Sequence, residues 1–299
     1  MGSTFLFDAN SLYARSWFAA RSMLSDPEGI PSSAEVLRLA INTTVLLLNP
    51  ETNKVGAYAD KCLFAWDGSR KHSKDREEKP PEFHDTKALL KETLSFILGA
   101  THAESPTEEG DDVVATALSK VSPDETAYVI SGDKDLMQLY GKNCRYYSLH
   151  DKCLITESFI TAKFGGISKP DQVSVYLALV GDSVDNIKGV RGIGPVKCKK
   201  LFKSVTSRMS LLETVDAIAA QLNEEQQAQF YESLDRTLLK DNLPDIPAPA
   251  PLSLQHPDEV DSLEIPQIGY YYRKFYEVYR CVGSLSEEQR QRYLGNADA

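Results

Sequence analysis

The chain has 299 residues, of which 42% are hydrophobic and 25% charged, the balance of a globular protein that can bury a full core. Its formal net charge of −10 argues at first against a nucleic-acid partner. No stretch has transmembrane length, the N-terminus has no basic leader region and the five cysteines show no C-x-x-C spacing, so we expect a cytoplasmic protein with free thiols rather than a membrane protein or a disulfide scaffold.

The distribution of the charge matters more here than its sum. The window 188–203 contains six basic residues and no acidic one, and a second basic cluster lies within residues 70–79. An acidic site flanked by basic patches would give the same negative total, so a nucleic-acid partner stays open.

The first two predicted strands both end at an acidic residue. Residues 4–7 form an apolar run that ends at Asp8, before a helical pattern over 12–23, and the apolar run 61–66 ends at Asp67. In open α/β sheets, ligands bind at this carboxyl edge of the strands. For Asp8, capping of the following helix is an equally good interpretation.

A charged segment and a crowded helix start follow. Residues 69–81, SRKHSKDREEKPP, are a solvated loop in the simplest interpretation, and a helix is predicted over 84–98. Glu109, Asp111 and Asp112 then precede a helix over 113–119. Negative charge there also suits the helix dipole, which is the alternative to a functional role.

The remaining elements complete an α/β pattern. A third strand over 127–131 leads into Asp133 and Asp135, and two short strands follow at 145–149 and 153–155. Strands alternating with helices predict a mostly parallel sheet with helices on both faces. Helical patterns then continue from residue 159 to about residue 240. Residues 242–252 are proline-rich and extended, and the tyrosines of 270–279 either pack against the body or stack on single strands.

The stretch 179–203 combines acidic, glycine-rich and basic elements. Asp182 and Asp185 are three residues apart, which predicts that both lie on one side of a helical turn and reach one cation. The hairpin Gly189–Gly194 permits positive φ and a close approach of a nucleic-acid backbone. Three lysines start the next helix, where backbone N–H groups favour phosphate: Lys197, Lys199 and Lys200.

Nine carboxylates make up the candidate site. Two unit charges about 6 Å apart repel by roughly 2–3 kcal/mol at an effective dielectric near 20, so a dense cluster needs cations to remain ionised. Oxygen ligands without His or Cys select Mg²⁺ or Mn²⁺, and two such ions stabilise the attacking and leaving oxygens when water displaces a phosphodiester. No histidine accompanies a serine or cysteine in these segments, so we find no candidate for a covalent intermediate. The nine are Asp8, Asp67, Glu109, Asp111, Asp112, Asp133, Asp135, Asp182 and Asp185.

Three motifs carry a family resemblance: EGDDV from Glu109, SGDKDLMQL from Ser131 and GDSVDNIKGVRGIGPVKCKKL from Gly181. They resemble the signatures of the 5′→3′ exonuclease and flap endonuclease family, which includes phage 5′ nucleases and the N-terminal nuclease domain of bacterial DNA polymerase I. The resemblance covers roughly residues 4–240. It implies a PIN-like, Rossmann-like core over 1–157, a helix-hairpin-helix DNA-binding lobe over 158–240 and an extension over 241–299 that packs on the core.

The resemblance implies a structure-specific 5′ nuclease of replication or repair that hydrolyses DNA with two Mg²⁺ ions, for which Mn²⁺ can substitute. Its implied partner is DNA with 5′ ends, nicks or flaps, with RNA–DNA hybrids left open, and we expect a monomer. One ion would be held by Asp67, Glu109 and Asp111 and the other by Asp133, Asp135 and Asp185, while Asp8, Asp112 and Asp182 would act directly or through water.

Contacts with DNA are implied as well. The hairpin would bind a monovalent cation, K⁺, through backbone carbonyls, here those of Val190 and Ile193, and this cation would touch a DNA phosphate. A catalytic role is implied for Arg76. The implied DNA-binding residues are Arg15, Arg70, Lys74, Arg76, Lys79, Gly189, Val190, Gly192, Ile193, Gly194, Lys197, Lys199 and Lys200.

One segment departs from the family pattern. The family carries a Tyr-Lys-x-x-Arg element in a basic-aromatic arch over the active site. Within residues 68–83, Lys79 matches the arginine and Arg76 the lysine, with Lys74 as an alternative, which leaves Asp75 in the tyrosine position. The segment is also short, so we expect a weak hold on long flaps. In the EGDDV motif, Gly110 replaces an alanine.

Two other classes of protein remain open. A PIN-like ribonuclease that removes RNA would share the carboxylates but would not need the glycine hairpin and its lysines. A protein that binds branched DNA without cutting it would have vacant acidic positions, and we find none.

Overall fold

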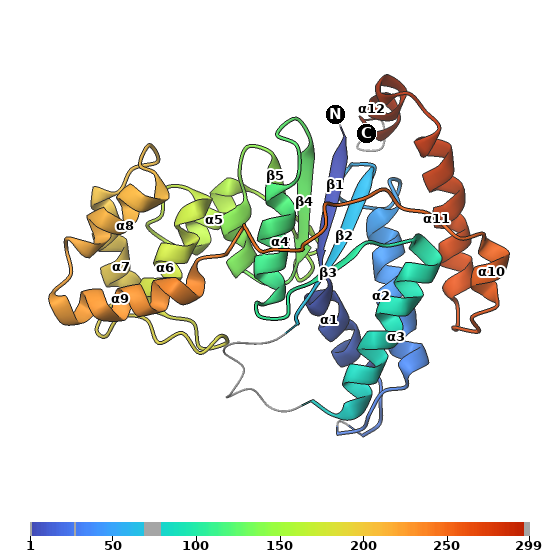
Figure 1. Cartoon of the computed structure of the whole chain (residues 1–299), viewed down its shortest axis with the longest axis horizontal. Coiled ribbons are helices and arrows are strands. Elements are labelled where there is room, and N and C mark those ends of the chain that lie inside the picture. The colour runs from blue at the N-terminus through green and yellow to red at the C-terminus, as the bar shows by residue number, and fades with distance from the viewer. Residues whose placement is uncertain (1, 27, 69–78, 296–299) are drawn as a thin grey trace.

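The computed structural model describes residues 2–26, 28–68 and 79–295, and its centre is a six-stranded sheet in the order β3-β2-β1-β4-β5-β6 (Figure 1). Strands β1 to β5 run parallel, and β6 is antiparallel to β5. The predicted α/β class with a mostly parallel sheet is therefore confirmed. The strands are β1 (Ser3–Asp8), β2 (Lys61–Trp66), β3 (His102–Glu104), β4 (Thr126–Ser131), β5 (Cys144–Ser148) and β6 (Cys153–Ile155).

Helices cover both faces of the sheet because the side chains of each strand alternate between them. Phe5 and Phe7 of β1 belong to the apolar cluster on one face, whereas Leu6 belongs to the cluster on the other. The first face is covered by α1 (Ala9–Ser22), α2 (Ser33–Leu48), α3 (Pro81–Leu98) and α11 (Ile268–Gly283), and the second by α4 (Gly110–Ser119) and the helical lobe.

The helical lobe lies beside the sheet and shares the second apolar cluster with it (Figure 1). Two of its helices begin with capping boxes, Ser210 with Glu213 and Asn223 with Gln226, in which side chain and backbone satisfy each other's hydrogen bonds. The elements are α5 (Glu157–Lys163), the 3₁₀ turn η3 (Pro170–Gln172), α6 (Val173–Val180), α7 (Pro195–Leu201), the 3₁₀ turn η4 (Phe202–Ser204), α8 (Leu211–Ala219) and α9 (Glu224–Thr237).

After α9 the chain crosses the molecule in an extended conformation, over α4 and toward α11 (Figure 1). Thr116 on α4 bonds to the backbone of Lys240 and Leu243, and Ala250 forms an antiparallel bridge with Cys62 of β2. The chain then forms α10 (Pro257–Asp261), α11 and α12 (Glu287–Gly295). The proline-rich segment thus wraps over the core.

The tyrosine-rich helix α11 packs mainly against the body. Tyr272 and Tyr279 are buried, and their hydroxyls donate to the backbone oxygens of Ile97 and Ala59 (both 2.6 Å). Tyr270 is 73% exposed. For the two buried tyrosines, packing is therefore the correct alternative to stacking on single strands.

Sequence patterns missed several short elements, and β3 and η2 (Asp135–Leu139) are the two nearest the carboxyl edge of the sheet. Strand β3 has three residues, too few for an alternating pattern to emerge, and it forms because Phe64, Ala65 and Trp66 offer a free edge of β2. Element η2 is a 3₁₀ turn. None of the described helices is long and apolar enough to cross a membrane.

Candidate active site

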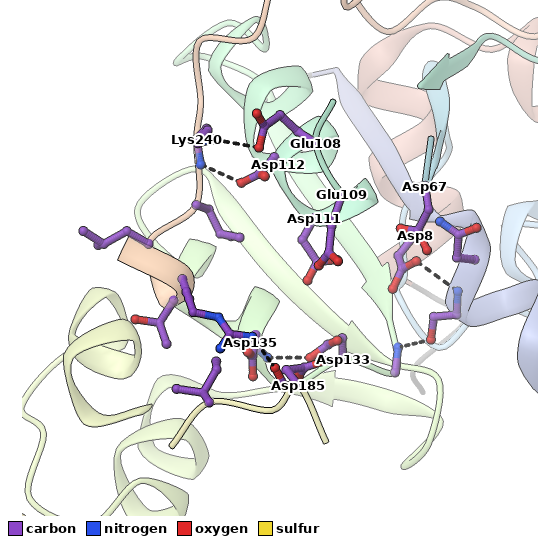
Figure 2. A pocket seen from close by; sticks show the side chains of 18 of the residues that line it. Asp8, Asp67, Glu108, Glu109, Asp111, Asp112, Asp133, Asp135, Asp185 and Lys240 are labelled. Carbon is purple, nitrogen blue, oxygen red and sulfur yellow. Dashed lines mark hydrogen bonds and ion pairs between the residues drawn. The ribbon is translucent and has the colours of Figure 1, made fainter. Parts of the chain in front are cut away.

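A cavity of about 400 Å³ lies at the carboxyl edge of the sheet, and acidic side chains dominate its lining (Figure 2). Strands β1, β2 and β4 end there side by side, because all three run parallel and are neighbours in the sheet. Eight of the nine predicted carboxylates line it together with Glu108 and Asp235: Asp8, Asp67, Glu109, Asp111, Asp112, Asp133, Asp135 and Asp185.

Asp8 has both functions that its sequence position suggests. It is the last residue of β1 and the N-cap of α1, where its Oδ1 accepts from the Ser11 N–H (3.0 Å). Its Oδ2 accepts from the Ser131 hydroxyl at the end of β4 (2.5 Å), so the carboxylate is fixed between two neighbouring strands. Burial raises the pKa of Asp8 to about 7, against the opposing effect of these hydrogen bonds.

Asp67 explains the glycine in the EGDDV motif. Its Oδ1 accepts from the Gly110 N–H (2.9 Å). A Cβ on Gly110 would lie 2.9 Å from that oxygen and 3.0 Å from the side-chain nitrogen of Asn10. An alanine methyl would therefore need the Asp67 and Asn10 side chains to shift, whereas glycine leaves both in place.

The acidic residues at the start of α4 point in two directions. Glu109 is the N-cap but makes no side-chain capping bond, and Figure 2 shows its carboxylate beside that of Asp111, both toward Asp133. Asp112 instead accepts from the Lys240 N–H (2.8 Å). The pKa of Asp111 lies well above its usual value, first because the carboxyl is buried and then because Asp133, Asp8, Asp67 and Asp135 surround it with negative charge.

Asp133 and Asp135 share a turn after β4. The Asp133 N–H donates to the Ser131 hydroxyl (2.8 Å), and the Asp135 N–H donates to Asp133 Oδ1 (2.9 Å). Burial raises the pKa of both carboxyls, that of Asp135 to about 8, and neighbouring acids including Asp185 add to the rise.

The predicted helical turn that carries Asp182 and Asp185 is wrong. Helix α6 ends at Val180, because Gly181 adopts a φ of 85° that terminates it. Residues 182–187 form a turn closed by two backbone hydrogen bonds between Asp182 and Ile187 (2.8 and 2.7 Å). The two carboxylates converge nonetheless, since the turn folds Asp185 back toward Asp182.

Three of these carboxylates could hold one cation. Oxygens of Asp135, Asp182 and Asp185 all lie within 4.8 Å of one another. The buried Asp135 Oδ1 has no hydrogen-bond partner among the residues described, and Asp182 Oδ2 is paired with the Lys134 ammonium at 2.5 Å. Buried oxygen ligands that repel one another fit a hard divalent cation. The set differs from the one that the resemblance implied, in that Asp182 takes the place of Asp133.

Sequence reasoning missed four charged residues at this cavity: Glu108, Asp235, Arg236 and Lys240. Glu108 is 8% exposed and pairs with the Lys240 ammonium (2.6 Å). The Arg236 guanidinium contacts the 182–187 turn. Glu108 adjoins the predicted acids and could have been included, but nothing in the local sequence of Arg236 or Lys240 indicates the site.

The glycine hairpin is held against the end of α6. A Cβ on Gly189, at a φ of 67°, would lie 2.5 Å from the Gly181 nitrogen, so the two glycines permit this close packing. The Val190 N–H donates to the Leu179 oxygen (2.9 Å), and the side chains of Val190 and Ile193 are buried. Gly192 has a positive φ and Gly194 an extended backbone. The three lysines on α7 are exposed: Lys197, Lys199 and Lys200.

The other implied DNA contacts lie apart from the acids. Arg15 is exposed on α1, and the Lys79 ammonium lies 5.3 Å from the centre of the Phe18 ring. Neither lines the acidic cavity. Arg70, Lys74 and Arg76 lie outside the described residues.

Known proteins share both the sequence and the fold. The chain is 29% identical over 218 residues to the 5′-3′ exonuclease of Mycoplasmopsis pulmonis, which covers 72% of this chain and 71% of that one. It is 33% identical over 223 residues to thermostable DNA polymerase I of Thermus caldophilus, covering 73% and 26%, and 29% identical over 255 residues to DNA polymerase I of Bacillus subtilis, covering 83% and 28%. The chain thus spans about a quarter of the length of these polymerases.

Two solved structures show the same fold at low identity. T5 5′-exonuclease with bound zinc superposes with a TM-score of 0.57 at 14% identity, covering 93% of this chain and 99% of that one. The catalytic core of Rad2 in complex with a DNA substrate gives 0.53 at 14% identity, covering 93% and 91%.

Family models agree with these relatives and confirm the resemblance found in the sequence. The model of the 5′-3′ exonuclease N-terminal resolvase-like domain matches residues 3–165, and that of the 5′-3′ exonuclease C-terminal SAM fold matches residues 168–266. Because the first of these alone spans more than half of the chain, the protein belongs to the 5′-3′ exonuclease family.

Proposed function

We propose that the chain is a structure-specific 5′ nuclease that hydrolyses DNA phosphodiesters at 5′ ends, nicks and flaps with the help of Mg²⁺. The observation that carries this is the convergence of carboxylates from β1, β2, α4, β4 and the 182–187 turn on one cavity, with the pKa values of Asp8, Asp111, Asp133 and Asp135 raised. The relatives support it: one solved T5 structure is described as a flap endonuclease pseudo-enzyme-product complex with DNA and metal ions.

The carboxylates divide into two candidate ligand sets. Asp67, Glu109 and Asp111 would hold one Mg²⁺, and Asp135, Asp182 and Asp185 the other, with Mn²⁺ able to substitute. Bound cations there would supply positive charge for the attacking and leaving oxygens of an in-line displacement by water. Asp8, Asp112 and Asp133 would orient these ligands or hold water, as the contacts of Asp8 with Ser131 and of Asp133 with the Asp135 N–H indicate.

The lobe would bind the DNA backbone and bring the scissile bond to the acids. Backbone carbonyls of Val190 and Ile193 would hold K⁺ against a phosphate, in line with the tight, glycine-dependent geometry of the hairpin. The proposal keeps the cytoplasmic location and the monomeric state expected from the sequence.

A cleavage assay separates this function from its two alternatives. The substrates are a 5′-labelled flap, a nicked duplex, a single strand and an RNA–DNA hybrid, each with Mg²⁺ and with EDTA. Release of short 5′ products from DNA only with Mg²⁺ supports the proposal. Cleavage of RNA alone would identify a ribonuclease, and retention of flap DNA without any cutting would identify a binding protein.

Lys197, Lys199 and Lys200 should contact phosphates rather than bases, because all three are exposed on the short helix α7 that follows the hairpin, Lys199 and Lys200 in its last turn. Changing Lys197 and Lys200 to alanine should weaken binding equally for unrelated sequences. The log–log slope of affinity against salt should flatten by roughly 0.9 for each lost contact. Binding of several duplexes from 50 to 200 mM salt measures this, and a loss confined to one sequence would instead indicate contacts to base edges.

Substrate choice should reflect the short, tyrosine-free segment between Asp67 and Pro80. Its basic residues are diluted by Asp75, Glu77 and Glu78, so its hold on single strands should be weak. Nicked, recessed or short-flap ends should be cut best, and Arg76→Ala should slow cleavage more than it weakens duplex binding. A series of flap lengths, with and without a protein block on the 5′ end, tests this. If long free flaps are preferred and a block stops cleavage, the segment threads flaps like a full-length arch.

A further inference from the structure

A five-residue segment, 236–240, connects the two ligand sets across the cavity. The core set comes from β2 and α4 and comprises Asp67, Glu109 and Asp111. The lobe set is named for the 182–187 turn of the lobe, which carries Asp182 and Asp185. Its third member, Asp135, lies in η2, directly after β4. Residues 236–240 all line the same cavity, and Lys240 lies beside α4 (Figure 2).

At one end of the segment, Arg236 holds the turn of the lobe set. Its Nη2 donates to the backbone carbonyl oxygen of Asp185 (2.9 Å) and its Nη1 to that of Asn186 (2.8 Å). Asn186 has a φ of 53°, a conformation that non-glycine residues adopt at some cost. A single planar guanidinium thus fixes two successive peptide groups, and with them the direction of the Asp185 side chain.

At the other end, Lys240 holds the start of α4. Its backbone N–H donates to Asp112 Oδ1 (2.8 Å), and its ammonium pairs with Glu108 (2.6 Å), whose side chain is 11% exposed. Glu108 and Asp112 flank Glu109 and Asp111 in the sequence. Lys240 therefore fixes the turn of backbone from which the core set projects.

The middle of the segment is anchored as well. The Thr237 hydroxyl donates to the Ser174 oxygen of α6 (2.9 Å), and the Thr237 oxygen accepts from Gln138 of η2 (3.1 Å). Four peptide units span at most about 14 Å. A short, anchored segment with one end on each ligand set leaves the separation of the sets little freedom.

We propose that residues 236–240 are a positioning element that holds the backbone of each ligand set, with Arg236 as the positioning residue for Asp185 in the lobe set and Lys240 as that for the start of α4 in the core set. The inference rests on the proposed function. Partners outside the ligands themselves commonly change metal affinity by about 10- to 100-fold when they are removed, since they orient the ligands. Arg236 acts on Asp185 through its backbone, and its loss should affect the lobe set alone.

The test measures Mn²⁺ binding to the whole chain without DNA, by electron paramagnetic resonance and calorimetry. The wild type should bind two Mn²⁺ ions. The Asp182→Asn protein should lose one of them, which identifies that ion as the one bound by the lobe set. Arg236→Gln should lower the affinity for that ion about tenfold and leave the affinity for the other ion within twofold of the wild type. Arg236→Lys should be intermediate, because an ammonium is a point charge without the planar fork. Conversely, Glu108→Gln should lower mainly the affinity for the ion of the core set.

Arg273→Gln is the matched control. Arg273 also makes two hydrogen bonds, to Asp258 (3.1 Å) and Asp261 (2.7 Å), but in the C-terminal helices away from the cavity. It should leave both Mn²⁺ affinities unchanged, whatever its effect on Tm. An Arg236→Gln protein that binds both ions like the wild type, or loses both equally, would overturn the inference while the proposed function stands. If the Gln variant does not fold, the Lys and Glu108 variants decide by the same criterion. A wild type without two Mn²⁺ sites would overturn both.

Discussion

Asp111→Asn is expected to abolish cleavage and at the same time to raise the thermal stability of the metal-free protein. Burial raises the pKa of Asp111, and the neighbouring carboxylates, first that of Asp133, raise it further. Removing a ligand that provides roughly 4 kcal/mol of transition-state stabilisation corresponds to a loss of about a thousandfold in rate. A raised pKa means that folding disfavours the ionised carboxylate, and asparagine removes this cost to the folded state. Each 1 kcal/mol gained raises Tm by roughly 2 °C.

The measurements are single-turnover cleavage of a 5′-labelled flap with Mg²⁺ and thermal unfolding in EDTA. Asp124→Asn is the control, because Asp124 is exposed at the amino end of β4, the edge of the sheet opposite the cavity. It should change neither quantity. Asp133→Asn should behave like Asp111→Asn. Substantial Mg²⁺-dependent cutting by both variants would contradict Asp111 as a ligand and Asp133 as a residue that orients the ligands. An unchanged or lower Tm in EDTA would contradict the cost of burying these acids.

Mg²⁺ should stabilise the protein more at pH 8 than at pH 6, because the metal-free cavity holds protons that the cations displace. Folding raises the pKa of Asp8 to about 7 and that of Asp135 to about 8, both from 3.8. Between roughly pH 4 and pH 8 the folded state therefore binds more protons than the unfolded state, and the free energy of unfolding falls as pH rises. Below about pH 4 both states are protonated, and this destabilisation is absent.

Metal binding opposes this fall in the free energy of unfolding with pH, because carboxylates bind cations in their ionised form. At a hundredfold excess over Kd, one site contributes about 2.7 kcal/mol of stability. Tm from pH 5 to 8, with EDTA and with Mg²⁺, should give two curves that diverge as pH rises. Asp135→Asn isolates one group, and in EDTA its curve should fall less steeply than that of the wild type. Parallel curves for wild type with and without Mg²⁺ would show that the acids do not bind it.

The sequence by itself determined the edge of the sheet at which the acids gather. Asp8 and Asp67 could be placed because each follows a buried strand of the same direction, and neighbouring parallel strands end at a common edge. The family motifs likewise identified the acids after β4 and at the start of α4. These features depend on local periodicity and on contiguous motifs, which a single sequence displays directly.

Tertiary structure alone decided how those acids are held. The conformation of the 182–187 turn depends on Gly181, whose positive φ ends a helix that spacing would have continued. The close contacts around Gly110 come from Asn10 and Asp67, far away in the sequence. Lys240 reaches Asp112 across 128 positions, and Arg236 reaches Asp185 across 51. Hydrogen bonds over such separations leave no periodic signal in the chain, because only the packing of α9 against α6 and of the following extended segment against α4 brings their partners together.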